Sequence, residues 1–141
     1  MILTANDINE MLSRTWPATK VRCLEVNKQE ALAIIKPLPD QLRPGGFISG
    51  PTQFGLADAA LWFLSCGVLG RAEPMVLTSE LSIRYLRPAQ GQKLYGKATL
   101  ARAGKRDIVG SVAIWVDEKE HKPTAIAQGT YRIHESFLEG T

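Results

Sequence analysis

Histidine and cysteine are scarce in this chain of 141 residues, which has two of each. His121 and His134 lie in a charged turn and near the C-terminus, so a metal site or a Ser-His or Cys-His nucleophile is hard to assemble. Cys23 and Cys66 lie in apolar stretches without CxxC spacing. We expect buried free thiols rather than a disulfide, and therefore a reducing cytoplasm.

A long uninterrupted hydrophobic segment is also missing. The longest apolar run, residues 54–69, is too short to span a bilayer and contains Asp58. The first residues include Asp7 and Glu10 and lack the cationic start and apolar core of a signal peptide. The net charge is +3, which suits an anionic ligand, but no Lys/Arg run reaches the length of a nucleic-acid arm. We expect a cytoplasmic protein that binds neither membrane nor nucleic acid.

What is present is the composition of an ordinary globular domain, 45% hydrophobic and 22% charged. A chain of this length suits one domain over residues 1–141 that buries about two-thirds of its unfolded surface. Thr4 as N-cap and Asp7 in the first turn predict an amphipathic helix within residues 1–17. Two short apolar runs, residues 21–26 and 30–36, predict a hairpin, and the breaker-rich stretch 37–46 is expected to be irregular.

Residues 51–69 predict a long helix, with Pro51 in its first turn and Ser49 or Gly50 as cap. Because the segment is apolar nearly all round, we expect the helix to be buried. Gly67 and Gly70 are expected to end it.

The segment 73–134 predicts four long strands. Its first strand, residues 77–86, alternates in polarity, which places Leu77, Ser79 and Leu81 on one face and Thr78 on the opposite, polar face. Three more strands are expected over residues 93–103, 108–116 and 123–133, and their tight connections imply antiparallel neighbours. The pattern predicts an α+β fold in which one antiparallel sheet wraps around one central helix.

Asp58 is the single charged residue between positions 54 and 69. An ionised carboxylate removed from water is costly unless it is paired or hydrogen-bonded, so Asp58 is either a core carboxylate bonded to Ser or Thr, or a functional base. The helix start near Gly50 offers N–H donors and a positive dipole end, and Asp58 follows about two turns later with its side chain tilted towards that end. We expect base and donors to meet at one patch, as attack of water on a carbonyl requires.

Four segments together resemble hotdog-fold acyl-CoA thioesterases of the phenylacetate-pathway (PaaI-like) type. They are residues 50–58, 79–89, 104–106 and 127–131, which occur in family order and span roughly residues 43–133. The resemblance implies a hotdog fold, a homodimer or homotetramer with sites between subunits, and metal-independent hydrolysis of an acyl-CoA to the free acid and CoA. It implies no cofactor beyond the coenzyme A of the substrate.

The resemblance also implies roles for particular residues. Asp58 stands at the position of the family's general base or nucleophile, and Gly50 at the backbone N–H that polarises the thioester carbonyl. Thr78 occupies the position of a hydroxyl residue that the partner subunit contributes to orient the water. The side chains that resemble contacts to the nucleotide phosphates of CoA are those of Arg84, Arg87, Lys105 and Arg106.

Some assignments have alternatives. Ser49-Gly50-Pro51 stands where the family has His-Gly-Gly, which makes Ser49 a candidate substrate contact, while Pro51 removes one N–H from the helix start. Gln53 is either a substrate contact or a plain surface amide. For Thr78 and for the Lys105-Arg106 pair, the alternative is a solvated position without a role in the site, which is the more common one for such residues. The alternative function is a non-catalytic hotdog module that binds an acyl-CoA or a related thioester, and a purely structural dimer is a third possibility.

Overall fold

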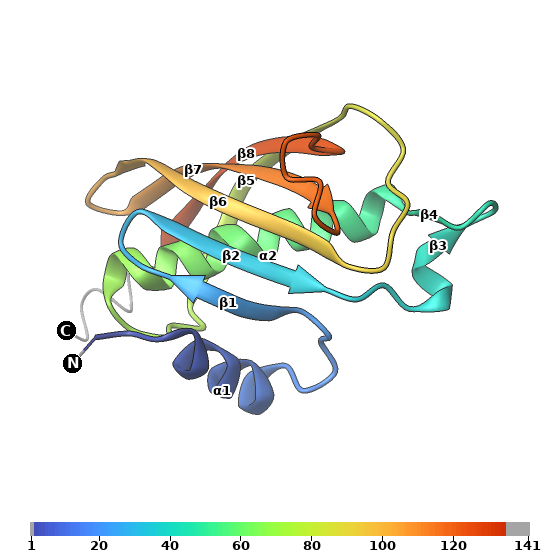
Figure 1. Cartoon of the computed structure of the whole chain (residues 1–141). Coiled ribbons are helices and arrows are strands. Elements are labelled where there is room, and N and C mark those ends of the chain that lie inside the picture. Colours follow the sequence, from blue (N-terminus) through green and yellow to red (C-terminus); the bar gives the residue numbers. More distant parts are fainter. Residues whose placement is uncertain (1, 135–141) are drawn as a thin grey trace.

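A long helix, α2 (Gly50–Leu69), packs along one face of a six-stranded antiparallel sheet (Figure 1). The computed structural model describes residues 2–134 of the chain. The strand order is β1-β2-β6-β7-β8-β5, so β1 and β5 form the two edges. The strands are β1 (Arg22–Val26), β2 (Glu30–Ile35), β5 (Val76–Tyr85), β6 (Leu94–Ala103), β7 (Asp107–Val116) and β8 (Ala125–Ile133). The predicted α+β hotdog architecture is confirmed.

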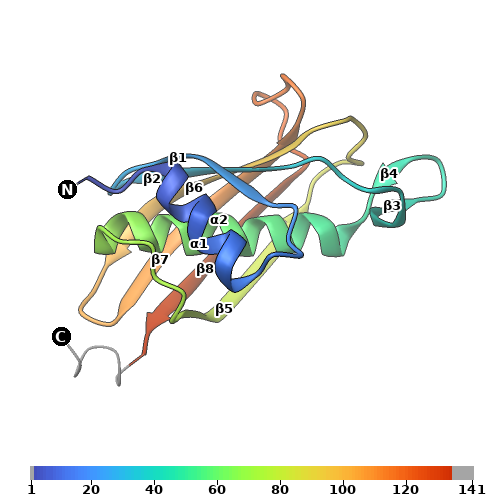
Figure 2. The same cartoon turned by 90° about the horizontal axis from the view of Figure 1, so that it is seen from below.

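The N-terminal helix α1 (Ala5–Thr15) begins after Thr4, as predicted. The Thr4 hydroxyl accepts from the Asp7 N–H, and the Asp7 carboxylate accepts from the Thr4 N–H, which forms a capping box. Asn9 on this helix accepts from the N–H of Cys23 at 2.8 Å and donates to its carbonyl at 2.9 Å. Helix α1 thereby covers part of the β1 edge, as Figure 2 shows from below.

Helix α2 starts at Ser49, which is its N-cap, and ends at Gly70, whose φ of 78° is left-handed. Gly67 does not end the helix, contrary to prediction. It lies inside the last turns, and a Cβ there would come 2.1 Å from the Asn27 carbonyl oxygen, so its role is to let α2 approach the β1–β2 turn. Among the described residues, only α2 is long and apolar enough to cross a bilayer, and most of it is buried against the sheet.

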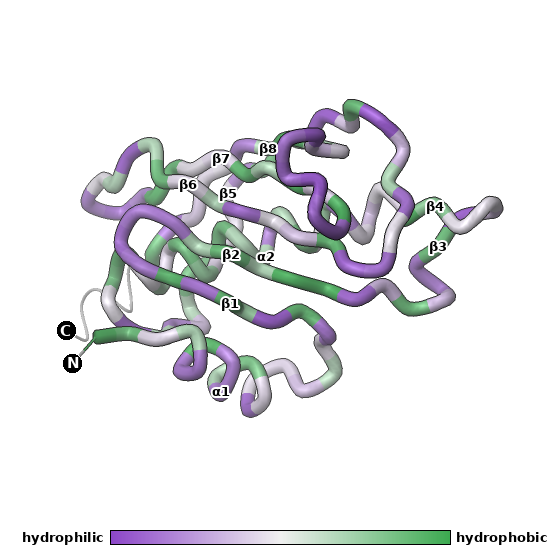
Figure 3. The backbone as a smooth tube through the Cα atoms, viewed as in Figure 1, coloured by the Kyte–Doolittle hydropathy of each residue, from purple (hydrophilic) through white to green (hydrophobic). Residues whose placement is uncertain are grey.

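The core lies between α2 and the sheet, where apolar side chains from both layers meet. Its largest fully buried members include Leu56, Leu61, Phe63 and Leu64 from the helix and Ile114 from β7. Apolar segments gather along α2 and the strands next to it, whereas the charged 117–122 connection between β7 and β8 projects away from them (Figure 3). This distribution explains why a helix that is apolar nearly all round is stable here.

Strand β5 contains a β-bulge between Thr78 and Glu80. The regular alternation predicted for this strand is therefore wrong in its first part, because the bulge inserts one extra residue and exchanges the two faces. Leu77 is 51% exposed, whereas Thr78 points towards α2 and Leu81 packs on the core beyond the bulge. The predicted placement of Leu77 and Ser79 with Leu81 fails for this reason.

The stretch expected to be irregular contains a short 3₁₀ turn, η1 (Pro39–Gln41), and a small hairpin of β3 (Leu42–Arg43) and β4 (Phe47–Ile48). Two backbone bonds tie this hairpin to its surroundings: Ser49 donates to the Gln41 carbonyl at 3.0 Å, and Ile48 donates to the Ala89 carbonyl at 2.8 Å. The hairpin thus fixes the chain immediately before α2 begins.

Candidate active site

The start of α2 leaves one backbone donor available among the described residues. The hydroxyl oxygen of Ser49 accepts from the Thr52 N–H at 3.3 Å, and the Gln53 N–H donates to the Ser49 carbonyl at 3.2 Å. Pro51 has no N–H. Of the first four helical positions, only Gly50 keeps an N–H that no described residue accepts, and this N–H lies at the positive end of the helix dipole.

Gly50 is held from the opposite side by β5. The Tyr85 hydroxyl donates to the Gly50 carbonyl at 2.7 Å, and a Cβ at position 50 would lie 3.1 Å from the Tyr85 hydroxyl oxygen. The lack of a side chain at Gly50 thus permits this contact, and the contact fixes the first peptide of α2.

Ser49 and Gln53 make contacts within the protein. The Ser49 side chain is occupied as the helix cap and lies 2.7 Å from the Thr52 hydroxyl. Gln53 is 4% exposed; its carbonyl oxygen accepts from the Thr124 hydroxyl at 2.9 Å, and its amide donates to the Ile48 carbonyl at 3.4 Å. Gln53 is therefore a buried amide that joins α2 to the segment before β8, and not the surface amide considered as the alternative.

Asp58 lies in the middle of α2, half-buried, and faces β5 and β8. One of its carboxylate oxygens, Oδ1, accepts from the Thr78 hydroxyl at 2.7 Å and from the Tyr131 hydroxyl at 2.7 Å. Thr78 belongs to the same chain as Asp58, whereas the resemblance implied a hydroxyl from the partner subunit. No described residue donates to the other oxygen, Oδ2, which leaves that oxygen able to accept a proton from water.

Tyr131 was not among the predicted site residues. It is 4% exposed, and its hydroxyl also lies 2.9 Å from the Asp58 carbonyl oxygen. Burial, followed by the negative charge of Asp58, raises the pKa of the Tyr131 phenol, so it remains a proton donor at neutral pH. The sequence contained one feature that could have pointed to Tyr131: it is a tyrosine at a core-facing position of a predicted strand. A buried phenol needs a hydrogen-bond partner, so such a position predicts a polar contact in the core.

Gly50 and Asp58 of one chain do not meet. Eight residues along an α-helix correspond to a rise of about 12 Å, so the Gly50 N–H and the Asp58 carboxylate cannot contact one thioester carbonyl together. The expectation that base and donor converge on one patch of the same helix is corrected by this spacing. Each group has its own fixed surroundings: Tyr85 holds Gly50, and Thr78 and Tyr131 hold Asp58.

The predicted basic residues lie at separate places. Arg106, in the β6–β7 turn, lines a hollow of about 460 Å³ together with Thr78, Arg132 and His134, and Lys105 precedes it in the same turn. Thr78 is one of its lining residues, whereas Arg132 follows the inward-facing Tyr131 in β8 and therefore projects from the opposite face of the sheet. At the far end of β5, the Arg87 guanidinium donates to the Pro123 carbonyl at 2.7 Å.

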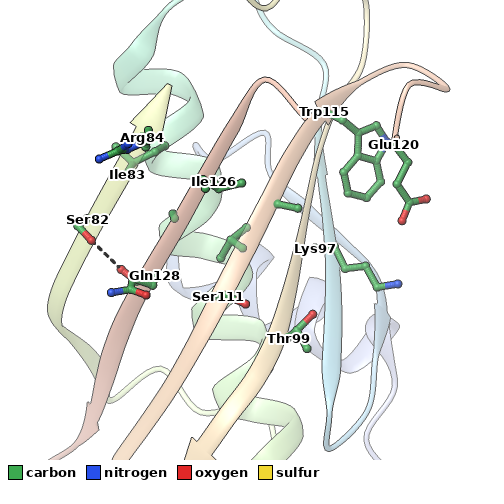
Figure 4. Close-up of a pocket in the computed structure, with 13 residues that line it drawn as sticks. Ser82, Ile83, Arg84, Lys97, Thr99, Ser111, Trp115, Glu120, Ile126 and Gln128 are labelled. Carbon is green, nitrogen blue, oxygen red and sulfur yellow. Dashed lines mark hydrogen bonds between the residues drawn. The ribbon is translucent and has the colours of Figure 1, made fainter. Parts of the chain in front are cut away.

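Arg84 lines a second hollow, of about 620 Å³, which lies on the sheet face turned away from α2 (Figure 4). Its polar members include Ser82, Lys97 and Gln128, and the Ser82 hydroxyl donates to the Gln128 carbonyl at 3.5 Å. The sheet separates this hollow from Asp58, so the structure does not bring Arg84 to the candidate site.

The two cysteines are free and buried, as predicted. Burial raises the pKa of Cys66 to about 11 and that of Cys23 to about 12, so both thiols are neutral at physiological pH. Among residues 2–134, no three His, Cys, Asp or Glu side chains are grouped so that they could hold a metal ion. Neither thiol is therefore a thiolate nucleophile at physiological pH, and Asp58 remains the candidate base.

Comparison with known proteins shows which families and structures this chain is similar to. Residues 45–121, more than half of the chain, match the sequence model of the thioesterase superfamily. A candidate thioesterase from Silicibacter sp. TM1040 superposes with a TM-score of 0.83 at 28% identity, over 95% of this chain and 94% of that one. No curated protein matches the chain.

Two further solved structures are under 25% identical and support the fold alone. Thioesterase superfamily member 2 from zebra fish has a TM-score of 0.78 at 17% identity, over 94% of this chain and 99% of that one. The PaaI protein of the phenylacetic acid degradation operon of E. coli has a TM-score of 0.69 at 22% identity, over 91% and 92% of the two chains.

Proposed function

The chain belongs to the thioesterase superfamily, and on this premise we propose that it hydrolyses an acyl-CoA thioester to the free acid and CoA, with Asp58 as the base. The observation that supports this most directly is the asymmetric environment of the Asp58 carboxylate. Two hydroxyls hold Oδ1, and no described residue donates to Oδ2. A carboxylate held in this way has one oxygen fixed by the protein and one oxygen available to water.

In the proposed reaction, Oδ2 accepts a proton from water as the water oxygen bonds to the thioester carbonyl carbon. The carbonyl oxygen becomes an oxyanion, which a backbone N–H at a helix start can stabilise. Collapse of this intermediate breaks the carbon–sulfur bond, and the CoA thiolate leaves and takes up a proton. The alternative is direct attack by Asp58 on the thioester carbonyl carbon, which expels the CoA thiolate and forms an anhydride. Single-turnover hydrolysis in ¹⁸O-labelled water then labels the Asp58 carboxylate when water attacks the Asp58 carbonyl carbon of that anhydride.

We further propose that a complete site needs two chains. The rise of about 12 Å between Gly50 and Asp58 prevents one chain from presenting both groups to a single carbonyl. A two-fold axis that aligns two copies of α2 in opposite directions would place Asp58 opposite Gly50 of the partner subunit. Strand β5 is an edge strand whose outer hydrogen-bonding groups have no described partner, so it offers a surface for a second copy.

The positive charges along the β5–β8 edge of the sheet suit a CoA ester. Arg106 and Arg132 line the hollow beside Thr78, and a phosphate-bearing ligand is favoured by arginine side chains at such a place. Arg132 is 64% exposed and bonds to Asp107 at 3.2 Å, an arrangement that solvent screens and that a phosphate can replace. These residues are the candidates for the nucleotide end of the substrate, together with the neighbouring Lys105.

The test is release of CoA thiol from a panel of short, medium-chain and aromatic acyl-CoAs. We expect Asp58→Asn to lower kcat by roughly 100- to 10,000-fold, because the amide cannot accept the proton from water. Glu10→Gln on α1 makes the same carboxylate-to-amide change away from the site and should retain wild-type rates. Equal turnover by Asp58→Asn and wild type would contradict the proposal.

Gly50 allows a second, sharper test. Gly50→Pro removes the free N–H, whereas Gly50→Ala adds a Cβ at the same place and keeps the N–H, so their difference isolates the donor. If the site is shared between chains, co-expressed Asp58→Asn and Gly50→Pro subunits should form heterodimers with one intact site and regain about a quarter of wild-type activity, assuming random pairing. No recovery would contradict the two-chain site.

The alternative function, a non-catalytic thioester-binding module, is motivated by the single free donor at the helix start. Pro51 and the Ser49 cap remove the donors that a second hydrogen bond to an oxyanion would use. The same panel separates the two functions. Saturable binding of acyl-CoA without thiol release supports the module, and thiol release that depends on Asp58 supports the enzyme.

A further inference from the structure

Tyr131 and Thr78 are directly opposite each other in the ladder between β5 and β8. Regular alternation through β5 would turn Thr78 away from α2, because Leu81 is three residues further on and packs on the core. The bulge between Thr78 and Glu80 brings Thr78 and Leu81 onto the same face. The two hydroxyls of the pair therefore point to one place on α2, where Asp58 lies.

The Tyr131 hydroxyl has one proton, and two acceptor atoms of Asp58 lie within hydrogen-bond distance of it. They are Oδ1 at 2.7 Å and the backbone carbonyl oxygen at 2.9 Å. A donor shared between the side chain and the main chain of one residue restricts the χ1 and χ2 angles of that residue. The Tyr131 ring is 4% exposed, so the hydroxyl is itself held by packing.

We propose that Tyr131 is a positioning residue, which holds Oδ1 of Asp58 so that Oδ2 is presented to the attacking water. This inference rests on the proposed function, since it assigns how the base is oriented. Tyr131 is nearly inaccessible to solvent and donates to the Asp58 carboxylate, so it acts through that carboxylate and does not touch the substrate. A base held in one orientation loses less entropy on reaching the transition state than a freely rotating one.

The inference predicts a loss in kcat with little change in KM. Tyr131→Phe removes one oxygen and keeps the ring, and we expect kcat to fall roughly 10- to 100-fold, the range for a hydrogen bond to a charged group. KM should stay within about twofold, because substrate contacts are retained. Tyr95→Phe is the matched control: Tyr95 stacks on Trp115 with ring centroids 5.6 Å apart and makes no described contact with Asp58.

A second pair of variants tests the other hydrogen bond to Asp58 Oδ1, which comes from Thr78 in β5. Thr78→Val removes the hydroxyl at constant shape and should lower kcat in the same way, whereas Thr78→Ser keeps the hydroxyl and should recover most of it. All rates are measured well below the melting temperature of each variant, and circular dichroism at that temperature shows that each is folded. A merely structural role would lower the melting temperature and leave kcat of the folded protein unchanged.

The outcomes separate this inference from the proposed function. If Asp58→Asn is inactive and Tyr131→Phe has wild-type kcat, the positioning role is wrong and the function stands. If Tyr131→Phe raises KM and leaves kcat unchanged, the positioning role is also wrong. If wild type releases no thiol, or Asp58→Asn is fully active, the proposed function fails and this inference fails with it.

Discussion

The Tyr85 hydroxyl donates to the Gly50 carbonyl oxygen at 2.7 Å and so joins the last residue of β5 to the first residue of α2. The same edge strand holds Asp58 through Thr78, nearer to its beginning. Strand β5 thus contacts both groups that the proposed reaction needs. The positions of the donor and the base are coupled through one strand, although they lie about two turns apart on the helix.

The Tyr85–Gly50 bond gives the first prediction. Tyr85→Phe leaves the first peptide of α2 free to move, so we expect kcat/KM to fall about three- to tenfold, in line with one hydrogen bond. Stability should change little, since Tyr85 is 48% exposed. Steady-state hydrolysis of the best acyl-CoA substrate measures the effect, and unchanged kcat/KM would show that the anchor has no role in the reaction.

Two glycines in α2 should respond to alanine in opposite ways. At Gly67 a Cβ would lie 2.1 Å from the Asn27 carbonyl oxygen, so Gly67→Ala must move α2 away from the β1–β2 turn and lower the unfolding free energy by about 1–3 kcal/mol. At Gly55 nothing lies within 4 Å of such a Cβ. Gly55→Ala should stabilise the helix by roughly 0.5–1 kcal/mol.

Urea denaturation of both variants measures these changes, and each serves as the control for the other. We expect the urea midpoint to fall for Gly67→Ala and to rise by a smaller amount for Gly55→Ala, with the m-value unchanged in both. A loss of stability in Gly55→Ala at high protein concentration, absent on dilution, would show instead that a second surface approaches α2 at Gly55.

The buried amide of Gln53 gives a third prediction. Thr124→Val leaves the Gln53 carbonyl oxygen without its 2.9 Å donor and should cost about 1–3 kcal/mol. The double variant Gln53→Leu/Thr124→Val removes both partners and should cost less than the sum of the two single changes. A double-mutant cycle by urea denaturation checks this, and strict additivity would contradict the coupling.

The raised pKa values of the two thiols predict how the unfolding free energy changes at alkaline pH. Burial raises the pKa of Cys66 from 9.0 to about 11, and that of Cys23 from 9.0 to about 12. Above about pH 9 the unfolded chain loses these protons before the folded chain does, so the unfolded state binds fewer protons and the unfolding free energy falls as pH rises. Well below pH 9, where both states keep their thiol protons, the two thiols contribute no slope.

The measurement compares urea midpoints at pH 8 and pH 10 for wild type and Cys23→Ala. The variant starts from a lower stability because of the cavity, but its loss between the two pH values should be smaller. An equal loss in both proteins would assign the alkaline slope to other groups.

The sequence was sufficient for the elements whose local and tertiary preferences agree. The cap at Thr4, the apolar helix after Ser49 and the alternation within the later strands each follow from side-chain chemistry near in sequence. Asp58 was found because a lone charge in an apolar helix needs an explanation. These features required no knowledge of which segments meet in space.

The features that could not be predicted from the sequence depend on contacts between segments that are distant in the chain. A bulge leaves the composition of β5 unchanged, so the inward turn of Thr78 could not be seen before its pairing with β8 was known. Gly67 has the sequence features of a helix end, and only the nearby Asn27 carbonyl explains it as a close approach. Tyr131 was passed over because it lies 73 residues from Asp58 in sequence.

The bulge in β5 has a consequence for comparing this protein with its relatives. Asp58 and Thr78 are 20 residues apart, and the extra residue of the bulge, Ser79, follows Thr78 in the chain. In a relative with a regular strand at this place, and a connection of the same length, the hydroxyl that reaches the carboxylate would lie one position later relative to the aspartate. An ungapped alignment would then pair Thr78 with an outward-facing residue, and the equivalent side chain should be sought one column away.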